Sequence, residues 1–318
     1  MDLRIRLLGA LIRRQSISSM TPDQVASAQT RTLPHNRATE LLFGGLAAGV
    51  ETEDRTMPGP GGEVALRIYR PRGPGPARPL VVNFHGGGWV LGSVEQNDHL
   101  CSTVAAGVGA VVVSVGYRLA PSHPFPAATE DCYAALVWAA ENAGALGADA
   151  SRIGVMGDSA GGNLAAVVAL TTRDRGGPPL AHQALIYPVT DATRSGDSYR
   201  TNAHAPVLSA EDMATFCRYY LAADTDPRSP SVSPLFAPDH TGLAPALVQV
   251  AELDPLRDDG VRYAAALRVA GTPVRFTEYV GMPHGFVSFP TLCRSAPQAL
   301  AEVCQEQRAA LHGPPGPG

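Results

Sequence analysis

The sequence predicts an α/β fold in which helices cover both faces of a mostly parallel sheet. Short runs of apolar and β-branched residues recur from residue 111 onward, and helical patterns lie between several of them. This alternation implies parallel strands joined by right-handed crossovers. The length of 318 residues fits one large domain of this class with a smaller accessory segment.

The strands are expected in two groups. Residues 51–84 contain three strand-like runs separated by segments rich in Gly and Pro, and because short turns join these first strands they should form an antiparallel edge. The later strands are expected at residues 111–115, 153–156, 184–187, 246–250 and 274–279. Helices are expected between several of them, as at residues 131–142, 163–173 and 259–270.

Residues 191–240 interrupt the alternation. They are rich in Ser, Asp and Pro around one amphipathic stretch at residues 210–221. Together with N-terminal cap helices in residues 1–45, this insertion is predicted to cover the C-terminal edge of the sheet, where α/β proteins place their sites. The core then consists of residues 46–190 and 241–312, and the tail at residues 313–318 is expected to be disordered.

The N-terminal sequence MDLRIRLLGALIRR has arginines on both sides of a short apolar patch. No small-residue cleavage site follows it, and no apolar run approaches the roughly 20 residues that span a bilayer, so we expect neither a signal peptide nor stable membrane insertion. An amphipathic helix that covers part of the same molecule is the preferred interpretation, and binding to a membrane surface is the alternative.

Composition excludes several classes of function. A formal net charge of −4, without basic runs and interleaved aromatics, argues against a nucleic-acid partner. The chain has no lysine, which excludes Schiff-base chemistry, a Ser-Lys dyad and a P-loop, because each needs a lysine amine. The five cysteines are odd in number and scattered, which favours reduced thiols and a cytoplasmic location over disulfides or zinc.

The segment GDSAGG, at residues 157–162, has the spacing of a nucleophile elbow. It lies between the strand and the helix predicted on either side of it, as the G-x-S-x-G turn requires. Small residues around Ser159 allow a turn so sharp that its hydroxyl projects into a cleft, beside the free N–H groups of the helix start. A tight strand-to-helix turn with an incidental serine is the alternative.

A serine nucleophile also needs donors for an oxyanion. The HGGG segment that begins at His85 follows a strand and is typical of the glycine loop of lipases and esterases. We assign the oxyanion hole to the N–H groups of Gly86, Gly87 and Ala160. The alternatives are a flexible loop and metal binding by His85, but no second histidine lies at ligand spacing, and we expect no metal site.

The base and the acid are expected after late strands. His284 directly follows the strand predicted at residues 274–279, and Asp254 lies 30 residues earlier, at the exit of the preceding strand. Three acids compete with Asp254, but they fall within the strand or on the following helix: Glu252, Asp258 and Asp259. The chain order Ser159, Asp254, His284 is the order expected of an α/β-hydrolase.

Five segments together resemble the hormone-sensitive-lipase-like family of bacterial and archaeal carboxylesterases: HGGGW at 85–89, YRLAPSHPFPAA at 117–128, GDSAGGN at 157–163, DPLRDDG at 254–260 and HGF at 284–286. The similarity covers about residues 40–300. It implies an eight-stranded α/β-hydrolase core with an antiparallel second strand, a helical cap, and hydrolysis of short-chain acyl esters. It also implies the same triad and oxyanion hole.

The predicted protein is a serine carboxylesterase that hydrolyses short- to medium-chain acyl esters through an acyl-enzyme, without a cofactor. Trp89, Asp158 and Tyr187 adjoin the motifs and are candidates for lining the substrate pocket. The expected partner is a small acyl ester, and the sequence leaves a homodimer open. Alternatives are a non-catalytic small-molecule receptor on the same fold and an amide or lactone hydrolase. A dinucleotide-binding enzyme is disfavoured because GDSAGG lacks the G-x-G-x-x-G spacing.

Overall fold

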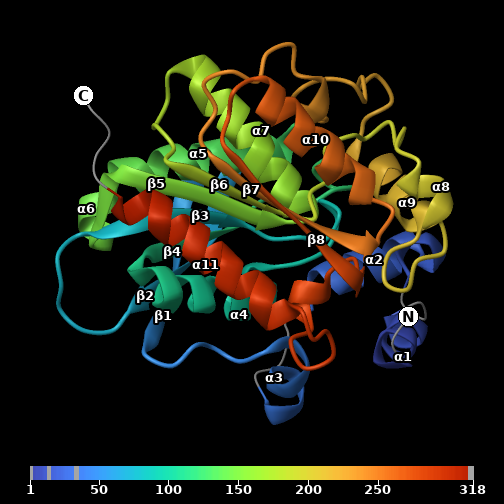
Figure 1. Ribbon diagram of the computed structural model, residues 1–318, viewed down its shortest axis with the longest axis horizontal. Coiled ribbons are helices and arrows are strands. Elements are labelled where there is room, and N and C mark those ends of the chain that lie inside the picture. The colour runs from blue at the N-terminus through green and yellow to red at the C-terminus, as the bar shows by residue number, and fades with distance from the viewer. Residues whose placement is uncertain (1–2, 13–15, 32–35, 314–318) are drawn as a thin grey trace.

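The computed structural model describes residues 3–12, 16–31 and 36–313 and contains an eight-stranded sheet between two layers of helices (Figure 1). The strands lie in the order β1-β2-β4-β3-β5-β6-β7-β8. Strand β2 is antiparallel to both of its neighbours, and all other neighbouring strands are parallel. The predicted α/β-hydrolase fold is therefore confirmed. The strands are β1 (Val50–Gly59), β2 (Gly62–Pro71), β3 (Arg78–Phe84), β4 (Val111–Gly116), β5 (Ala148–Asp158), β6 (His182–Ile186), β7 (Ala246–Leu253) and β8 (Val274–Pro283).

The predicted antiparallel edge is present in β1 and β2 but does not extend to β3. Strand β3 lies inside the sheet, parallel to both β4 and β5. Its residues 79–84 are all buried, so both of its faces are covered. A strand with apolar residues on both faces is typical of the centre of a parallel sheet. The position of β3 in the sheet therefore follows from its burial and not from its place early in the chain.

Helices cover the two faces of the sheet unequally. The buried side chains of α5, α7 and α10 belong to one hydrophobic cluster, and those of α4 and α11 belong to a second cluster on the opposite face (Figure 1). Helix α11 was not predicted from the sequence. The helices are α1 (Leu3–Ile12), α2 (Pro22–Gln29), α3 (Arg37–Phe43), α4 (Asp98–Val104), α5 (Ala127–Glu141), α6 (Ala143–Leu146), α7 (Ala160–Arg175), α8 (Ser198–Thr201), α9 (Ala210–Tyr220), α10 (Arg257–Val269) and α11 (Ala296–His312).

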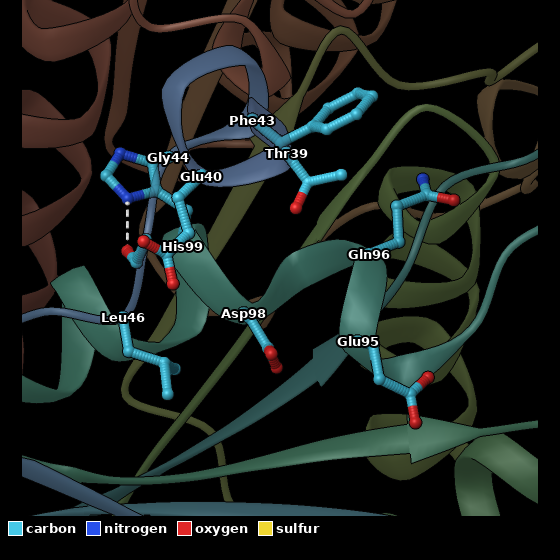
Figure 2. Close-up of a pocket in the computed structure, with 10 residues that line it drawn as sticks. Thr39, Glu40, Phe43, Gly44, Leu46, Glu95, Gln96, Asp98 and His99 are labelled. Atoms are coloured by element: carbon cyan, nitrogen blue, oxygen red, sulfur yellow. Dashed lines mark hydrogen bonds between the residues drawn. The ribbon is translucent and has the colours of Figure 1, made fainter. Parts of the chain in front are cut away.

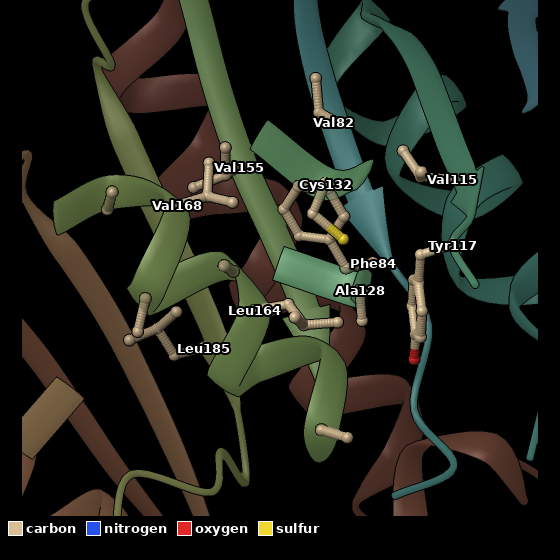
Figure 3. Packing of buried hydrophobic residues seen from close by; sticks show 14 of the residues in the cluster. Val82, Phe84, Val115, Tyr117, Ala128, Cys132, Val155, Leu164, Val168 and Leu185 are labelled. Carbon is tan, nitrogen blue, oxygen red and sulfur yellow. The ribbon is translucent and has the colours of Figure 1, made fainter. Parts of the chain in front are cut away.

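The larger cluster holds the sheet against α5 and α7. Figure 3 shows Val82 and Val155, from neighbouring strands, packed with Cys132 of α5 and Leu164 of α7. All four side chains are inaccessible to solvent. This packing fixes the end of β5 against the start of α7, where the predicted elbow lies.

The N-terminal segment contacts the insertion at residues 191–240. The Asp212 carboxylate of α9 accepts hydrogen bonds from the hydroxyl of Ser16 and from the backbone N–H of Ser18. Ile5 and Leu8 of α1 are also buried. Residues 1–2, 13–15 and 32–35 of the predicted N-terminal cap, and residues 314–318 of the predicted disordered tail, lie outside the described residues.

Within the described ranges, none of the helices is both long and apolar enough to cross a membrane.

Candidate active site

The turn at Ser159 has the strained geometry that its flanking glycines allow. Strand β5 ends at Asp158, α7 begins at Ala160, and Ser159 between them has φ 57° and ψ −120°. A Cβ atom on Gly157 would lie 2.2 Å from the Gly161 carbonyl oxygen, and one on Gly161 would lie 1.9 Å from the Phe84 carbonyl oxygen. Side chains at these positions would collide with backbone, so only glycine fits.

Three predicted residues meet at the C-terminal ends of β5, β7 and β8. Ser159 Oγ lies 2.8 Å from His284 Nε2, and His284 Nδ1 lies 2.7 Å from Asp254 Oδ2. The second carboxylate oxygen of Asp254 accepts the backbone N–H of Leu256 at 2.8 Å. Asp254 is inaccessible to solvent, so its carboxylate is held in one orientation against the imidazole. This geometry allows the imidazole to take the proton of the Ser159 hydroxyl.

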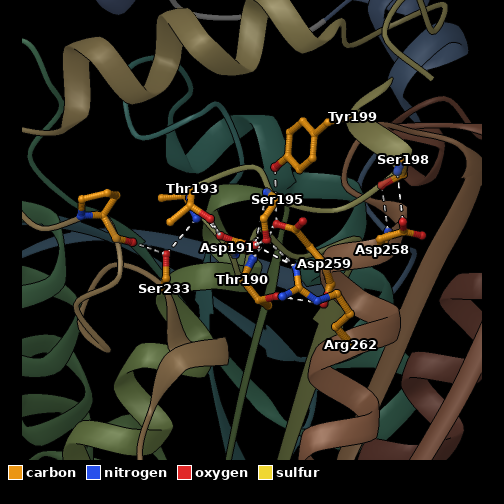
Figure 4. A network of polar contacts seen from close by, with 12 residues as sticks. Thr190, Asp191, Thr193, Ser195, Ser198, Tyr199, Ser233, Asp258, Asp259 and Arg262 are labelled. Atoms are coloured by element: carbon orange, nitrogen blue, oxygen red, sulfur yellow. Dashed lines mark hydrogen bonds and ion pairs between the residues drawn. The ribbon is translucent and has the colours of Figure 1, made fainter. Parts of the chain in front are cut away.

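The competing acids have other contacts. Glu252 accepts the backbone N–H of Gly281 at 2.6 Å, and Asp258 accepts the backbone N–H of Ser198 at 3.0 Å. Asp259 accepts two backbone N–H groups from residues 190 and 191, in the polar network that Figure 4 shows. Burial raises the pKa of the Asp259 carboxyl well above its ordinary value. None of the three contacts His284 in the structure.

The loop after β3 differs from the prediction at Gly86. Its N–H donates to Asp158 Oδ1 at 2.9 Å, so it is not free for a substrate oxygen. Among the described residues, the N–H groups of Gly87, Gly88 and Ala160 have no hydrogen-bond acceptor, and both glycines line the cavity that contains Ser159. In this structure the predicted Gly86 N–H is therefore paired with Asp158, and the N–H groups of Gly87, Gly88 and Ala160 are the ones without an acceptor.

Asp158 is buried between the elbow and the glycine loop. Besides Gly86, the side-chain amide of Asn97 donates to Asp158 Oδ1 at 2.9 Å. Burial raises the pKa of the Asp158 carboxyl above its ordinary value, and these two hydrogen bonds offset the rise only partly. Asp158 reaches the cavity wall, but its hydrogen bonds join two segments of the protein.

The two aromatic candidates lie beneath the cavity. Trp89 is fully buried and stacks on Tyr220 of α9, with ring centroids 4.3 Å apart. Tyr187 is also buried, and its ring meets the His284 ring edge-on at 4.8 Å. The structure thus places Trp89 in the core against α9 and Tyr187 against the imidazole of His284.

A mostly apolar cavity of about 460 Å³ opens above Ser159 and His284. Its wall combines the N-terminal segment, the glycine loop, the insertion and the segment after β8. With the elbow residues Asp158 and Ser159, the wall draws on five separate parts of the chain, and no periodic pattern in the sequence predicts such a set. Wall residues that the sequence analysis did not identify include Met20, Ala28, Phe43, Gly88, Leu91, Val207, Leu208, Met213, Phe216, Ser288 and Phe289.

A second, smaller pocket of about 200 Å³ shares Phe43 and Gln96 with the wall of the main cavity (Figure 2). Its histidine, His99, lies 3.0 Å from the Gly45 carbonyl oxygen through Nδ1. The Thr39 hydroxyl in this pocket donates to the Asn36 carbonyl oxygen at 2.9 Å, whereas the Ser159 hydroxyl of the main cavity is paired with His284.

Comparison with known proteins identifies the class. Residues 81–288 match the family model described as the alpha/beta hydrolase fold. The chain belongs to this α/β-hydrolase family, in its hormone-sensitive-lipase-like branch, as the motifs implied.

The most similar relatives include two proteins of Mycobacterium tuberculosis. The chain is 43% identical to carboxylesterase NlhH over 96% of both chains, and 44% identical to carboxylic ester hydrolase LipN over 87% of this chain and 75% of that protein. Among solved structures, the hyperthermophilic esterase of the archaeon Pyrobaculum calidifontis superposes with a TM-score of 0.84 at 40% identity, over 97% of this chain and 98% of the other.

Proposed function

We propose that this carboxylic ester hydrolase uses Ser159 as its nucleophile, His284 as its general base and Asp254 as the acid that orients the imidazole. One observation carries the proposal: the hydroxyl of Ser159 lies 2.8 Å from His284 Nε2 at the floor of an apolar cavity. A serine hydroxyl becomes a useful nucleophile only when such a base accepts its proton.

In the proposed reaction, Ser159 Oγ attacks the ester carbonyl carbon while His284 accepts the hydroxyl proton. The negative charge on the carbonyl oxygen faces the N–H groups of Gly87, Gly88 and Ala160. His284 then protonates the leaving alcohol, and an acyl-enzyme remains. Water, deprotonated by the same imidazole, attacks the acyl carbon; the bond to Ser159 Oγ then breaks, His284 returns the proton to Oγ, and the acid leaves.

The proposed substrates are small acyl esters of short to medium chain length. The cavity falls within the size range of small-molecule sites, and its wall is predominantly apolar, which suits an acyl or alkyl group. We assign the N-terminal segment and residues 191–240 to a cap, and residues 46–190 and 241–312 to the catalytic core. The cap supplies much of the apolar wall, so it is expected to set the limit on chain length.

Location and assembly are further proposals. A cytoplasmic location agrees with five scattered cysteines, none of which forms a disulfide in the described chain. A homodimer stays a prediction from the sequence. Strand β8 forms one edge of the sheet, and its Val280 is 74% exposed, so a second copy could pair with this edge.

The decisive experiment compares the purified protein with Ser159→Ala on p-nitrophenyl esters from acetate to decanoate. We expect activity to peak at short or medium chains, and kcat to fall by about 10⁴-fold or more in Ser159→Ala. Ser151→Ala, an exchange of an exposed serine on the same strand, serves as the control. Full activity of a folded Ser159→Ala protein would refute the proposed nucleophile. Amide and lactone substrates tested in parallel measure how far the activity extends beyond esters.

A further inference from the structure

A glutamine at the end of α2 reaches the backbone beside the glycine loop. Gln29 Nε2 donates to the Val90 carbonyl oxygen at 2.8 Å and to the Ala120 carbonyl oxygen at 2.7 Å. Val90 and Ala120 are both fully buried. Within the described ranges, no other group donates to either carbonyl. Gln29 therefore satisfies two buried acceptors that would otherwise have no partner.

These two carbonyls belong to residues whose N–H groups close the turn that carries the proposed oxyanion donors. The Gly87 carbonyl oxygen accepts the N–H groups of Val90 and Leu91 at 3.2 and 2.8 Å, which closes the turn from Gly87 to Leu91. The Ala120 N–H donates to the Trp89 carbonyl oxygen at 2.9 Å, which joins the turn to the chain after β4. The Gln29 amide thus binds both segments that meet here, the turn after β3 and the chain after β4.

The two glycines do not fix the conformation of this turn by their own backbone preferences. Gly87 and Gly88 have φ angles of +121° and +62°, and glycine is the residue with the greatest backbone freedom. A Cβ atom on Gly87 would lie 2.1 Å from the Leu91 carbonyl oxygen, so the turn is also tightly closed. Its hydrogen bonds therefore decide where the two glycine N–H groups point.

We propose that Gln29 is a positioning residue, which orients the oxyanion donors Gly87 and Gly88 through the carbonyls of Val90 and Ala120. The inference rests on the oxyanion hole of the proposed function. It gives the N-terminal segment a role in catalysis besides covering the cavity, in whose wall lie Ala28 of α2 and Met20, which precedes that helix. Binding of the N-terminal segment and alignment of the hole are then coupled.

The test exchanges the Gln29 amide for groups of similar length that cannot donate. Gln29→Met removes the hydrogen bonds, and Gln29→Glu at pH 8 places a carboxylate against the two carbonyls. The matched control is Gln24→Met on the same helix, because Gln24 forms the capping box with Thr21 at the opposite end of α2. Gln24→Met weakens the helix without touching the loop.

We expect kcat for p-nitrophenyl butyrate to fall about 10- to 100-fold in both Gln29 variants, with KM within threefold of the parent, because misplaced donors affect the transition state more than binding. The rate of phosphonylation by a fluorophosphonate ester should fall in parallel. The final extent of labelling counts the intact active sites, so kcat is expressed per labelled site and a partly unfolded preparation does not obscure the result. Gln24→Met should keep kcat within twofold.

Two results would overturn the proposal: a kcat within twofold of the parent in both Gln29 variants, or an equal loss of kcat in Gln24→Met. Ser159→Ala, measured alongside, separates this from the proposed function. If Ser159→Ala is inactive and the Gln29 variants are fully active, the nucleophile stands and only the role of Gln29 is refuted. If Ser159→Ala stays active, the proposed site itself is wrong.

Discussion

Positive φ angles in residues other than glycine concentrate around the candidate site. Trp89, Ser159 and Tyr187 have φ angles of 61°, 57° and 36°; Ser159 and Tyr187 directly follow β5 and β6, and Trp89 lies in the loop after β3. Such conformations cost roughly 1–3 kcal/mol and persist only where the surrounding structure enforces them. Here the enforcing contacts include the Ser159 N–H to the Ile186 carbonyl oxygen at 2.9 Å and the Tyr187 N–H to the Gln249 carbonyl oxygen at 2.7 Å.

Asp158 is a single residue that joins two parts of the site through its hydrogen bonds. Asp158→Ala removes the acceptor of both Gly86 N–H and the Asn97 amide and leaves two buried donors unpaired. We expect it to lower the free energy of unfolding by about 2–4 kcal/mol, measured by urea denaturation. Asp158→Asn keeps an oxygen at the same place and should cost less. Equal stability of the two variants would contradict this account.

At the scale of elements, α9 connects the insertion to the glycine loop. Ser209 and Asp212 form a capping box at its first turn, and Asp212 also accepts from the N-terminal segment. On the same helix, Phe216 lies over the loop: a Cβ atom on Gly88 would meet its ring carbon Cδ1 at 2.2 Å. Helix α9 therefore places the Phe216 ring next to Gly88, a proposed oxyanion donor.

Shortening this wall should change the range of substrates. Phe216→Ala removes a ring from the cavity wall, so we expect the chain length with the highest kcat/KM in the p-nitrophenyl ester series to increase by two or more carbons. Arg218→Ala, on the exposed side of α9, is the matched control and should leave the profile unchanged. A profile identical to the parent in Phe216→Ala would show that this residue does not limit the acyl chain.

At the scale of the whole molecule, the sheet buries titratable groups. His85 and His182 are almost fully buried, and burial lowers the pKa of each imidazole to about 4. In the unfolded chain a histidine takes up its proton near pH 6.5. Between pH 6.5 and 4, the unfolded chain therefore binds more protons than the folded protein, and stability is lost as the pH falls through this window.

This linkage predicts a pH-dependent free energy of unfolding. Each buried histidine contributes a slope of up to about 1.4 kcal/mol per pH unit between pH 6 and 4.5, with stability increasing toward higher pH. His182→Gln should reduce the measured slope by about one histidine's share, as determined by urea denaturation at several pH values. His123→Gln, at an exposed position, should leave it unchanged. An unaltered slope in His182→Gln would mean that His182 does not resist protonation in the folded protein.

The strands and the elbow could be predicted because their causes are local. Apolar runs specify where strands form, and the glycines around Ser159 specify a sharp turn, so the expected strand at 153–156 lies inside β5. The residues at which strands begin and end could be predicted less well. Strand β5 begins at Ala148, five residues earlier than expected, because Ala148 and Asp149 pair with Arg78 and Pro79 of β3, and this pairing is a long-range contact.

The hydrogen bonds of the glycine loop could not be predicted from the local sequence. The motif HGGG has three adjacent glycines, and nothing in their sequence says which N–H is free. The Asp158 carboxylate takes the Gly86 N–H, and that carboxylate comes from the end of β5, 72 residues later in the chain. Trp89 likewise adjoins the motif, yet it stacks on Tyr220 of the insertion instead of lining the cavity.

By itself, the sequence determined the fold class, the sharp turn at Ser159 and the chain order of the candidate residues Ser159, Asp254 and His284, because each depends on residue types at fixed positions along strands and turns. Only the tertiary structure decided which loop donors are free, which side chains form the cavity wall, and that Gln29 reaches the loop from α2. These features depend on distances between segments far apart in the chain, and packing of the whole sheet sets those distances.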